Sequence, residues 1–196
     1  MKHAIILAHP EPDSFNASVA NTYAQAVRVR GHEAIVRDLY AIGFDPCLKA
    51  NERPDKPDQV VAPDVAAERA LLADADVFVL IYPIWFGSTP AILKGYIERV
   101  FNQGFAFDQF ATGQMRPLLG GRQLISFTSS GATNAWLDEA GVRLSLRYVV
   151  DGYLSKIFGL EIVEHVHFPS ISPGLGERWV LENLATVRSK VAEHFG

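Results

Sequence analysis

Three short segments of this chain combine residue types that can bind and orient a polar ligand. The first runs from His9 to Ser18 and offers hydroxyl, amide and imidazole groups directly before an expected helix. Backbone N–H groups at a helix N-terminus attract anions, so this segment suits a phosphate-bearing cofactor. Alternatively, Ser14 and Asn16 could simply cap the helix, and His9 could be a structural histidine.

The second and third segments add different chemistry. Residues 83–90 place Trp85 and Phe86 beside a glycine, and residues 128–136 are rich in hydroxyl groups. Taken alone, the aromatic pair could be ordinary core, and the hydroxyl segment could be a polar turn before a helix cap. Taken together, the three segments provide an anion site, a flat aromatic wall and a polar edge. A flavin needs all three, so we predict a flavin pocket.

Motifs and composition exclude several other classes. The first segment carries neither G-x-G-x-x-G nor G-x-x-x-x-G-K-[ST], which argues against a Rossmann enzyme or a P-loop NTPase. A net charge of −4 weighs against nucleic acid or an anionic membrane as a partner. Cys47 is the single cysteine, so we expect neither disulfides nor a zinc site, and no other metal site is predicted. Because no long apolar stretch or signal-peptide pattern occurs, we expect a cytoplasmic protein without an integral membrane segment.

Elements that alternate between strand and helix must position these segments. Such alternation is typical of a parallel sheet with helices on both faces. We predict one domain over 1–196, an α/β flavodoxin-like doubly wound sheet of five strands in the order 2-1-3-4-5. Two stretches, 41–63 and 103–121, are expected to be irregular. The expected strands are 3–8, 33–37, 76–82, 122–128 and 160–166, and the expected helices are 16–30, 64–73, 90–102, 134–152 and 175–194.

The predicted topology explains why the three segments should meet. Ligands of open parallel sheets lie beyond the carboxyl ends of the strands, where the strand order reverses. The segments that begin at residues 9, 83 and 128 follow the first, third and fourth expected strands. Their side chains are therefore expected to converge at one edge of the sheet.

The residues of these segments resemble the motifs of a known family. AHPEPDSFNAS at 8–18, YPIWFGSTPAILKGYIERVFNQGFAF at 82–107 and LISFTSSGA at 124–132 are similar to motifs of the flavodoxin-like NAD(P)H:quinone reductases, the DT-diaphorase family. The resemblance implies ping-pong two-electron (hydride) transfer from NAD(P)H to a quinone-like or other planar acceptor. It also implies bound FAD, with FMN as the alternative, and a homodimer with the active site at the subunit interface.

The resemblance assigns roles to individual residues. The flavin phosphate and ribityl chain would be surrounded by His9, Ser14, Phe15, Asn16 and Ser18. The flavin ring would be lined by Pro83, Ile84, Trp85 and Phe86. Its polar edge would meet Thr128, Ser129, Ser130 and Gly131. Phe107 would lie in the loop that covers the substrate.

The chain departs from the mammalian members at one point. Those enzymes have a Tyr and a His shortly after the third motif, and an alignment without gaps places Trp136 and Val142 there. Tryptophan can donate a hydrogen bond but does not usefully exchange a proton, and valine does neither. Trp136 and Arg143, the residue after Val142, are the candidates for a catalytic role, and Trp136 is also a candidate substrate contact. No catalytic residue is assigned, because the flavin carries the hydride.

Several alternatives stay open at this point. The chain could be an FMN-dependent azo- or nitroreductase, a regulatory flavoprotein subunit of a potassium-efflux system, or a flavin-free structural homologue. Helix 134–152 has more apolar surface than one amphipathic stripe needs, which favours a dimer interface, with a deeply buried helix as the alternative. The phenylalanine-rich stretch 101–110 belongs either to a satellite core or to a substrate lid.

Overall fold

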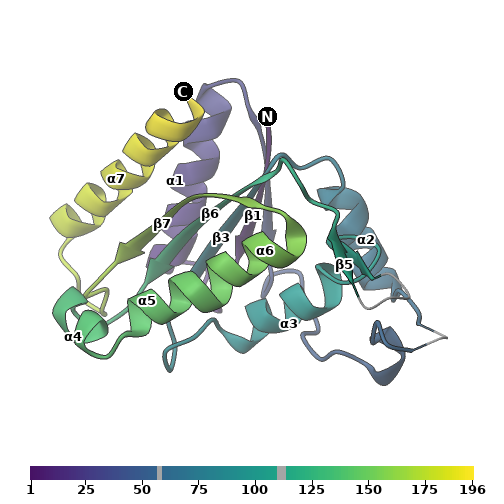
Figure 1. Ribbon diagram of the computed structural model, residues 1–196. Coiled ribbons are helices and arrows are strands. Elements are labelled where there is room, and N and C mark those ends of the chain that lie inside the picture. Colours follow the sequence, from purple (N-terminus) through teal and green to yellow (C-terminus); the bar gives the residue numbers. More distant parts are fainter. Residues whose placement is uncertain (57–58, 110–113) are drawn as a thin grey trace.

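A five-stranded parallel sheet lies at the centre of the computed structural model, which describes residues 1–56, 59–109 and 114–196 (Figure 1). The strand order is β2-β1-β3-β6-β7, which confirms the predicted order 2-1-3-4-5 once the short strands β4 and β5 are set aside. The strands of this sheet are β1 (Lys2–Leu7), β2 (Glu33–Asp38), β3 (Val77–Pro83), β6 (Gln123–Ser129) and β7 (Glu161–Phe168).

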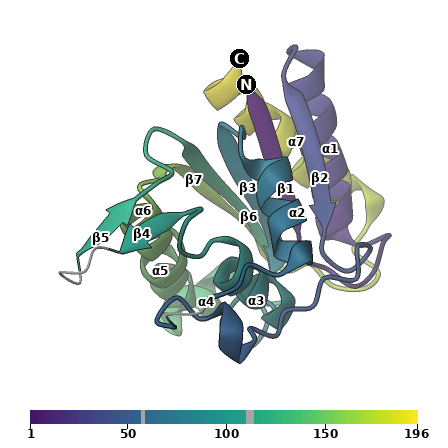
Figure 2. The ribbon, with the colours of Figure 1, turned by 90° about the vertical axis from the view of Figure 1, so that its right-hand side faces the viewer.

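Helices cover both faces of the sheet and bury the central strands (Figures 1 and 2). Helices α1 (Phe15–Val29) and α7 (Glu177–Phe195) pack on one face; α2 (Pro63–Leu72), α3 (Ala91–Val100) and α6 (Tyr153–Phe158) pack on the other. All seven residues of β3 are buried, because this strand has helices above and below it. That double coverage is the physical reason for its continuous apolar sequence.

The expected single helix over 134–152 is wrong. The chain forms α4 (Asn134–Glu139), α5 (Val142–Leu146), a π-helical turn η2 (Arg147–Gly152) and then α6. The break falls at Gly141, which has a φ of +68°. Glycine adopts this left-handed conformation without a steric penalty because it has no side chain. The alternative of a deeply buried helix is also wrong, since Leu144, Tyr148 and Val149 are 61–71% exposed. Within the described residues, no helix is both long and apolar enough to cross a membrane.

The stretch 103–121 is more ordered than expected. It contains an antiparallel hairpin of β4 (Phe107–Gln109) and β5 (Met115–Pro117). Phe105 and Phe107 pack against the core, and the Phe107 ring stacks on Phe158 with 6.3 Å between centroids. The satellite-core interpretation therefore applies to these two rings. Phe110 lies outside the described residues.

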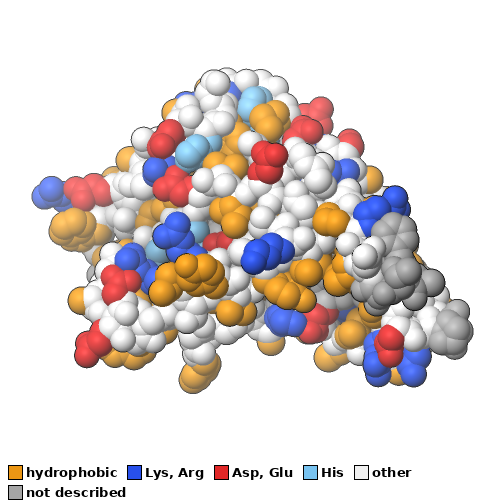
Figure 3. Space-filling model, in the orientation of Figure 1, with side chains coloured by type: hydrophobic (Ala, Val, Ile, Leu, Met, Phe, Trp, Pro, Cys, Tyr) orange, Lys and Arg blue, Asp and Glu red, His pale blue; other side chains and the backbone are white. Residues whose placement is uncertain are grey.

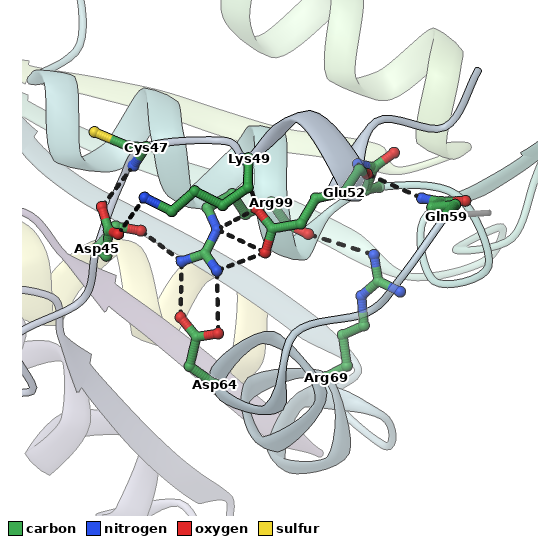
Figure 4. Close-up of polar contacts among 9 residues, drawn as sticks. Asp45, Cys47, Lys49, Glu52, Gln59, Asp64, Arg69 and Arg99 are labelled. Carbon is green, nitrogen blue, oxygen red and sulfur yellow. Dashed lines mark hydrogen bonds and ion pairs between the residues drawn. The ribbon is translucent and has the colours of Figure 1, made fainter. Parts of the chain in front are cut away.

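The stretch 41–63 is anchored to α3 by one buried arginine (Figure 4). The Arg99 side chain, 3% exposed, pairs with Glu52 at 2.6 Å and Asp64 at 2.7 Å, and it donates a hydrogen bond to the Asp45 carbonyl at 2.6 Å. Glu52 ends the short 3₁₀ helix η1 (Ala50–Glu52). Buried charges are tolerated when they are paired in this way. The excursion, as far as it is described, is thus a fixed part of the fold.

Strands β6 and β7 are joined with a shift in register. Leu124 pairs with Ile162, but the next residue of β6, Ile125, pairs with Glu164. Val163 is therefore an extra residue, as in a β-bulge. Beyond it, Ser126 pairs with His165 and Thr128 with His167.

Candidate functional site

The first loop forms the helix N-terminus that the sequence predicted. The Ser14 hydroxyl accepts a hydrogen bond from the Ala17 N–H at 3.2 Å and caps α1. The other N–H groups of a first helical turn have no intrahelical acceptor, so an anion can take them. The Ser18 hydroxyl bonds the Ser14 carbonyl at 3.3 Å, and Phe15 packs edge-on against Phe168. Ser14 is thus a cap, Phe15 a partly buried core residue, and both lie at the edge of a candidate anion site.

His9 joins the first loop to the second. Its Nδ1 accepts a hydrogen bond from the Glu11 N–H at 3.1 Å, and its ring lies 5.7 Å from the Trp85 ring, measured between centroids. Partial burial lowers the pKa of His9 below its usual value, which favours the neutral imidazole at neutral pH. His9 therefore packs beside the aromatic wall and does not add a fixed charge.

The second loop is a tight turn that presents its aromatic residues to solvent. Trp85 and Ser88 exchange two backbone hydrogen bonds of 3.0 Å, and the turn residues Phe86 and Gly87 have φ of +50° and +74°. Phe86 is fully exposed at the tip and Trp85 is 39% exposed, whereas Pro83 is buried at the end of β3. The interpretation of Trp85 and Phe86 as ordinary core is wrong. Both rings are available to a flat ligand.

Ser129 connects the third loop to the other two. Its hydroxyl donates a hydrogen bond to Asn16 Oδ1 at 2.8 Å, and its carbonyl accepts one from the Ile84 N–H at 2.7 Å. Ser129 and Asn16 are both buried, whereas Gly131 is exposed at the loop surface. The structure thus brings the three predicted segments together at the carboxyl edge of β1, β3 and β6.

The sequence analysis missed three candidate residues in this region: Asp151, His165 and His167. The two imidazoles contact the predicted Thr128, whose hydroxyl lies 2.9 Å from His165 Nε2 and 2.9 Å from His167 Nδ1. The carboxylate of Asp151, on η2, lies 2.5 Å from His165 Nδ1. The alternation His165-Val166-His167 at the end of an apolar strand was the signal, because residues two apart on a strand share a face.

His167 also contacts the third loop. Its Nε2 lies 3.1 Å from the Ser130 hydroxyl, which in turn lies 3.2 Å from the Ala132 carbonyl. Burial lowers the pKa of His167 to about 4, and the nearby His165 and Arg143 act in the same direction. His167 is therefore neutral at physiological pH.

A hollow of about 210 Å³ opens beside these histidines. In Figure 3, histidine and arginine side chains gather around it next to apolar side chains. Its lining residues are Ile84, Asp138, Arg143, Leu144, Leu146, Arg147, His165 and His167. Arg143 is held by two hydrogen bonds to Asp138, of 2.6 and 2.9 Å. Of the two predicted catalytic candidates, Arg143 lines the hollow, whereas Trp136 is 57% exposed on α4 and does not.

A second cavity of about 320 Å³ lies between α3, the β4–β5 hairpin and α6. Phe107, the predicted substrate-loop residue, lines it together with Met115, Val149 and Tyr153. Ser88 and Thr89 of the second loop form part of the same wall. The cavity is mostly apolar, so Phe107 is placed for contact with an apolar ligand or partner.

One cluster away from the loops has metal-ligand residue types. Atoms of Glu164, Glu193 and His194 lie within 4.8 Å of one another. Lys190 pairs with both carboxylates at 3.0 Å, and His194 bonds Glu164 at 2.8 Å. These contacts form an ion-pair cluster that joins β7 to α7.

The parallel sheet, its strand order and the loops converging at its carboxyl edge define a flavodoxin-like protein. Residues 1–191 match the sequence model of the family described by its flavodoxin-like fold, and the chain belongs to this family. An uncharacterized NAD(P)H oxidoreductase of Haemophilus influenzae is 34% identical over 172 residues, which are 87% of this chain and 85% of the relative. NAD(P)H dehydrogenase (quinone) 1 of Cavia porcellus is 34% identical over 150 residues, 67% of this chain; the match spans only 54% of that relative.

Solved structures share the whole fold. The NAD(P)H:quinone oxidoreductase from Methanothermobacter marburgensis is 26% identical and superposes with a TM-score of 0.85, covering 100% of this chain and 99% of the other. An FMN-dependent NADH-azoreductase from Bacillus anthracis, solved with FMN, has a TM-score of 0.72 at 18% identity and covers 98% of both chains. The second likeness concerns the fold alone.

Proposed function

We propose that this chain is an oxidoreductase that binds a flavin and transfers two electrons from NAD(P)H to a quinone-like or other planar acceptor. The observation that carries the proposal is the position of Ser129, whose hydroxyl and carbonyl hold Asn16 and Ile84 in one site. The named activities of the relatives in Haemophilus and Cavia support the same reaction class. A bound flavin would supply the hydride chemistry, and the protein would bind and orient it.

The residues at the carboxyl edge fit such a group. Asn16 accepts the Ser129 hydrogen bond through Oδ1, which leaves its NH₂ group as a donor toward a ligand. The free N–H groups at the start of α1 suit a phosphate. Trp85 and Phe86 present exposed rings for a flat partner, which soluble proteins seldom leave uncovered without function. We assign these residues and His9, Ser14, Ser18 and Ile84 to flavin binding.

The third loop would contact the polar edge of the flavin. The Ser130 N–H is bonded to the Phe168 carbonyl at 3.0 Å, so it serves the fold. Gly131 is exposed and is the position from which a backbone N–H can reach a ligand. A donor aimed at the edge where negative charge develops would stabilise the reduced ring.

The choice between FAD and FMN is part of the proposal. We propose FAD, as the resemblance to the quinone reductases implies, with FMN as the alternative that the azoreductase fold allows. The substrate would lie over the flavin near the cavity that Phe107 lines.

We also propose a homodimer. Leu144, Tyr148, Val149 and Tyr153 are 58–71% exposed and form an apolar surface on α5, η2 and the start of α6. Burying such side chains is favourable by about 1.5–3 kcal/mol each, which a partner subunit would supply. The apolar cavity opens beside the same surface, so a second copy would complete it.

One experiment tests the proposed function. The flavin is released from purified protein, identified by chromatography, and NADH and NADPH oxidation is followed with a quinone series and an azo dye. We expect one flavin per chain and faster oxidation with quinones than with the dye. A protein that holds no flavin after reconstitution with FAD and FMN would contradict the proposal. Turnover of the dye alone would favour the azoreductase.

A further inference from the structure

A continuous line of hydrogen bonds runs from the protein interior to the third loop. It begins at Asp151, which is 2% exposed and also accepts a hydrogen bond from the Ser126 hydroxyl at 2.9 Å. From Asp151 it passes to His165 at 2.5 Å and to the Thr128 hydroxyl at 2.9 Å. It continues to His167 at 2.9 Å and ends at the Ser130 hydroxyl at 3.1 Å.

One arrangement of protons satisfies this line with each histidine neutral. His165 donates from Nδ1 to the Asp151 carboxylate and accepts at Nε2 from the Thr128 hydroxyl. Thr128 then accepts from Nδ1 of His167, whose Nε2 accepts from Ser130. Each hydroxyl donates once, and each imidazole has one donor and one acceptor nitrogen.

A second arrangement satisfies the same contacts with one more proton. Ser130 now donates to the Ala132 carbonyl, which lies 3.2 Å away, and accepts from Nε2 of His167. Thr128 reverses and donates to Nδ1 of His167, while His165 donates from both nitrogens. The added proton therefore resides on His165, beside a carboxylate that stabilises it, although it can enter at Ser130.

We propose that Asp151 and His165 store one proton, which moves between them and the third loop through Thr128 and His167. The proposal rests on the proposed function, because reduction of a quinone needs that proton. NAD(P)H, one proton and a quinone give NAD(P)⁺ and a hydroquinone; the hydride comes from NAD(P)H and the proton from His165. His165 then returns to the neutral form and is reprotonated from solvent through the hollow.

The groups around the line of hydrogen bonds favour storage of the proton at its inner end, at Asp151 and His165. Burial keeps His167 neutral, so it passes a proton without retaining it. Asp138 on α4, Arg143 on α5 and Arg147 on η2 face the two histidines across the hollow. Tyr82 faces Asp151 from β3; burial raises its pKa, and its buried hydroxyl has no hydrogen-bond partner among the described residues. The Asp151 carboxyl group is the one that lies at hydrogen-bond distance from His165.

The relay stands on different residues from those of the mammalian enzymes. Their Tyr and His positions correspond here to Trp136 and Val142 in the ungapped alignment, and neither is suited to exchange a proton. The charge-handling groups in this chain come instead from β6, β7 and η2. His165 and His167 are positioning and proton-transfer residues in this scheme, and Ser130 is the end nearest the predicted flavin edge.

Histidine NMR tests the relay independently of turnover. Two-bond ¹H–¹⁵N spectra identify which ring nitrogen carries a proton, and they are recorded from pH 8.5 to 5 on the purified protein and on T128V and S145A. We expect His167 to change from the Nδ1–H to the Nε2–H form when the line of hydrogen bonds takes up one proton. In T128V, His167 should keep one tautomer throughout, whereas S145A, which removes an exposed hydroxyl on α5 outside the line, should behave like the wild type.

Two results would overturn the proposal. One is a wild-type His167 that keeps a single tautomer over the whole pH range. The other is a T128V protein whose histidines change together as before. Signals of His3 and His32, at the opposite end of the sheet, report whether each variant is folded.

Kinetics link the relay to turnover. With flavin bound, T128V should slow the acceptor half-reaction at least tenfold above pH 7.5 and leave reduction by NAD(P)H within threefold of wild type. S145A, which alters an exposed hydroxyl on α5, serves as the control. If the histidines are coupled but no acceptor is reduced, the proposed function fails and the relay stands; if turnover is normal and the histidines titrate independently, the relay alone fails.

Discussion

The Ser129 hydroxyl donates a 2.8 Å hydrogen bond to Asn16 Oδ1, joining residues that are 113 positions apart in the sequence. Asn16 is 3% exposed and Ser129 equally so, which means that water cannot replace either partner. The bond fixes the start of α1 against the end of β6. The two loops are therefore parts of one preformed site.

Asn16→Ala should weaken both the fold and the site. Removing one partner of a buried hydrogen bond costs about 1–3 kcal/mol, because the Ser129 hydroxyl is left without an acceptor. We expect urea unfolding to lose that amount and the Kd for flavin to rise at least tenfold. Asn21→Ala, at an exposed position on the same helix, is the control and should change neither measurement. Equal flavin affinity in the two variants would remove Asn16 from the site.

Phe86→Gly should separate stability from binding. Phe86 has a φ of +50° and packs against little of the fold, so glycine relieves backbone strain there. We expect the free energy of unfolding to stay equal or to rise by up to about 1 kcal/mol. Flavin affinity should nevertheless fall at least fivefold, since the ring provides part of the aromatic wall. Fluorescence titration and urea unfolding measure the two effects, and unchanged affinity would contradict the assignment.

Arg99→Met should destabilise the excursion at 41–63. The variant leaves the buried Glu52 carboxylate without its partner. Removing one partner of a buried ion pair lowers the free energy of unfolding by about 3–5 kcal/mol. Lys94→Met on the same helix removes a surface ion pair with Glu98 and should cost less than about 1 kcal/mol. Urea unfolding compares the two variants. Similar losses would mean that Arg99 does not anchor the excursion.

Stability should fall on acidification because of His3. Burial, with His32 adding to it, lowers the pKa of His3 from 6.5 to about 4. The unfolded chain therefore binds more protons than the folded one between these values, so stability is full above pH 6.5 and is lost as the pH falls toward 4. The loss is at most about 3 kcal/mol, from 1.36 kcal/mol per pKa unit.

The variant His3→Gln checks this assignment. Glutamine has no titratable proton in this range and can still bond to Tyr23, the buried partner of His3 at 2.9 Å. Unfolding free energies at pH 7, 5.5 and 4.5 should converge for the two proteins as the pH falls. His167, whose pKa is also lowered, reduces the stability of both proteins in the same way as the pH falls. Parallel curves would show that His3 does not contribute.

Tyr148→Glu should break the proposed homodimer and leave the subunit folded. Tyr148 is 71% exposed in the single chain, so a charge there disturbs no internal packing. We expect light scattering to report a dimer for the wild type and a monomer for the variant, with equal helix content by circular dichroism. Trp179→Glu, at an exposed aromatic position on α7, is the control and should remain dimeric. A monomeric wild type would contradict the proposal.

The sheet was predictable because its signals are local. Each of the five strands is a short apolar run, and the strand order follows from the alternation with helices. The division at Gly141 was harder to predict, since one glycine inside an apolar periodic stretch is compatible with a continuous helix. The three-residue strands β4 and β5 were missed because so few residues show no alternation. Contacts such as Arg99 with Glu52, 47 residues apart, are invisible to any local pattern.

The loops of the site were predictable, but the partners behind them were not. His9, Asn16, Trp85 and Ser129 stand in motifs whose chemistry is local. Asp151 was hidden in what looked like one apolar helix, and only the π-helical turn directs it toward the sheet. The histidines of β7 lie in an edge strand. Which face of the sheet their side chains take depends on the register of that strand, and the sequence alone does not give it.

That register depends on one residue, Val163. If Val163 were not skipped and instead paired with Ile125, the parity of β7 would be inverted beyond it: Ser126 would pair with Glu164, and Thr128 with Val166. The two imidazoles would then face α7 and the ion-pair cluster, and a carboxylate would point toward Asp151. Deletion of Val163 would place Glu164 directly after Ile162 and keep the present pairs, so the tautomer change of His167 should persist in the NMR spectra. The polar character of this end of the sheet is thus decided by which residue of the strand the hydrogen-bond ladder skips.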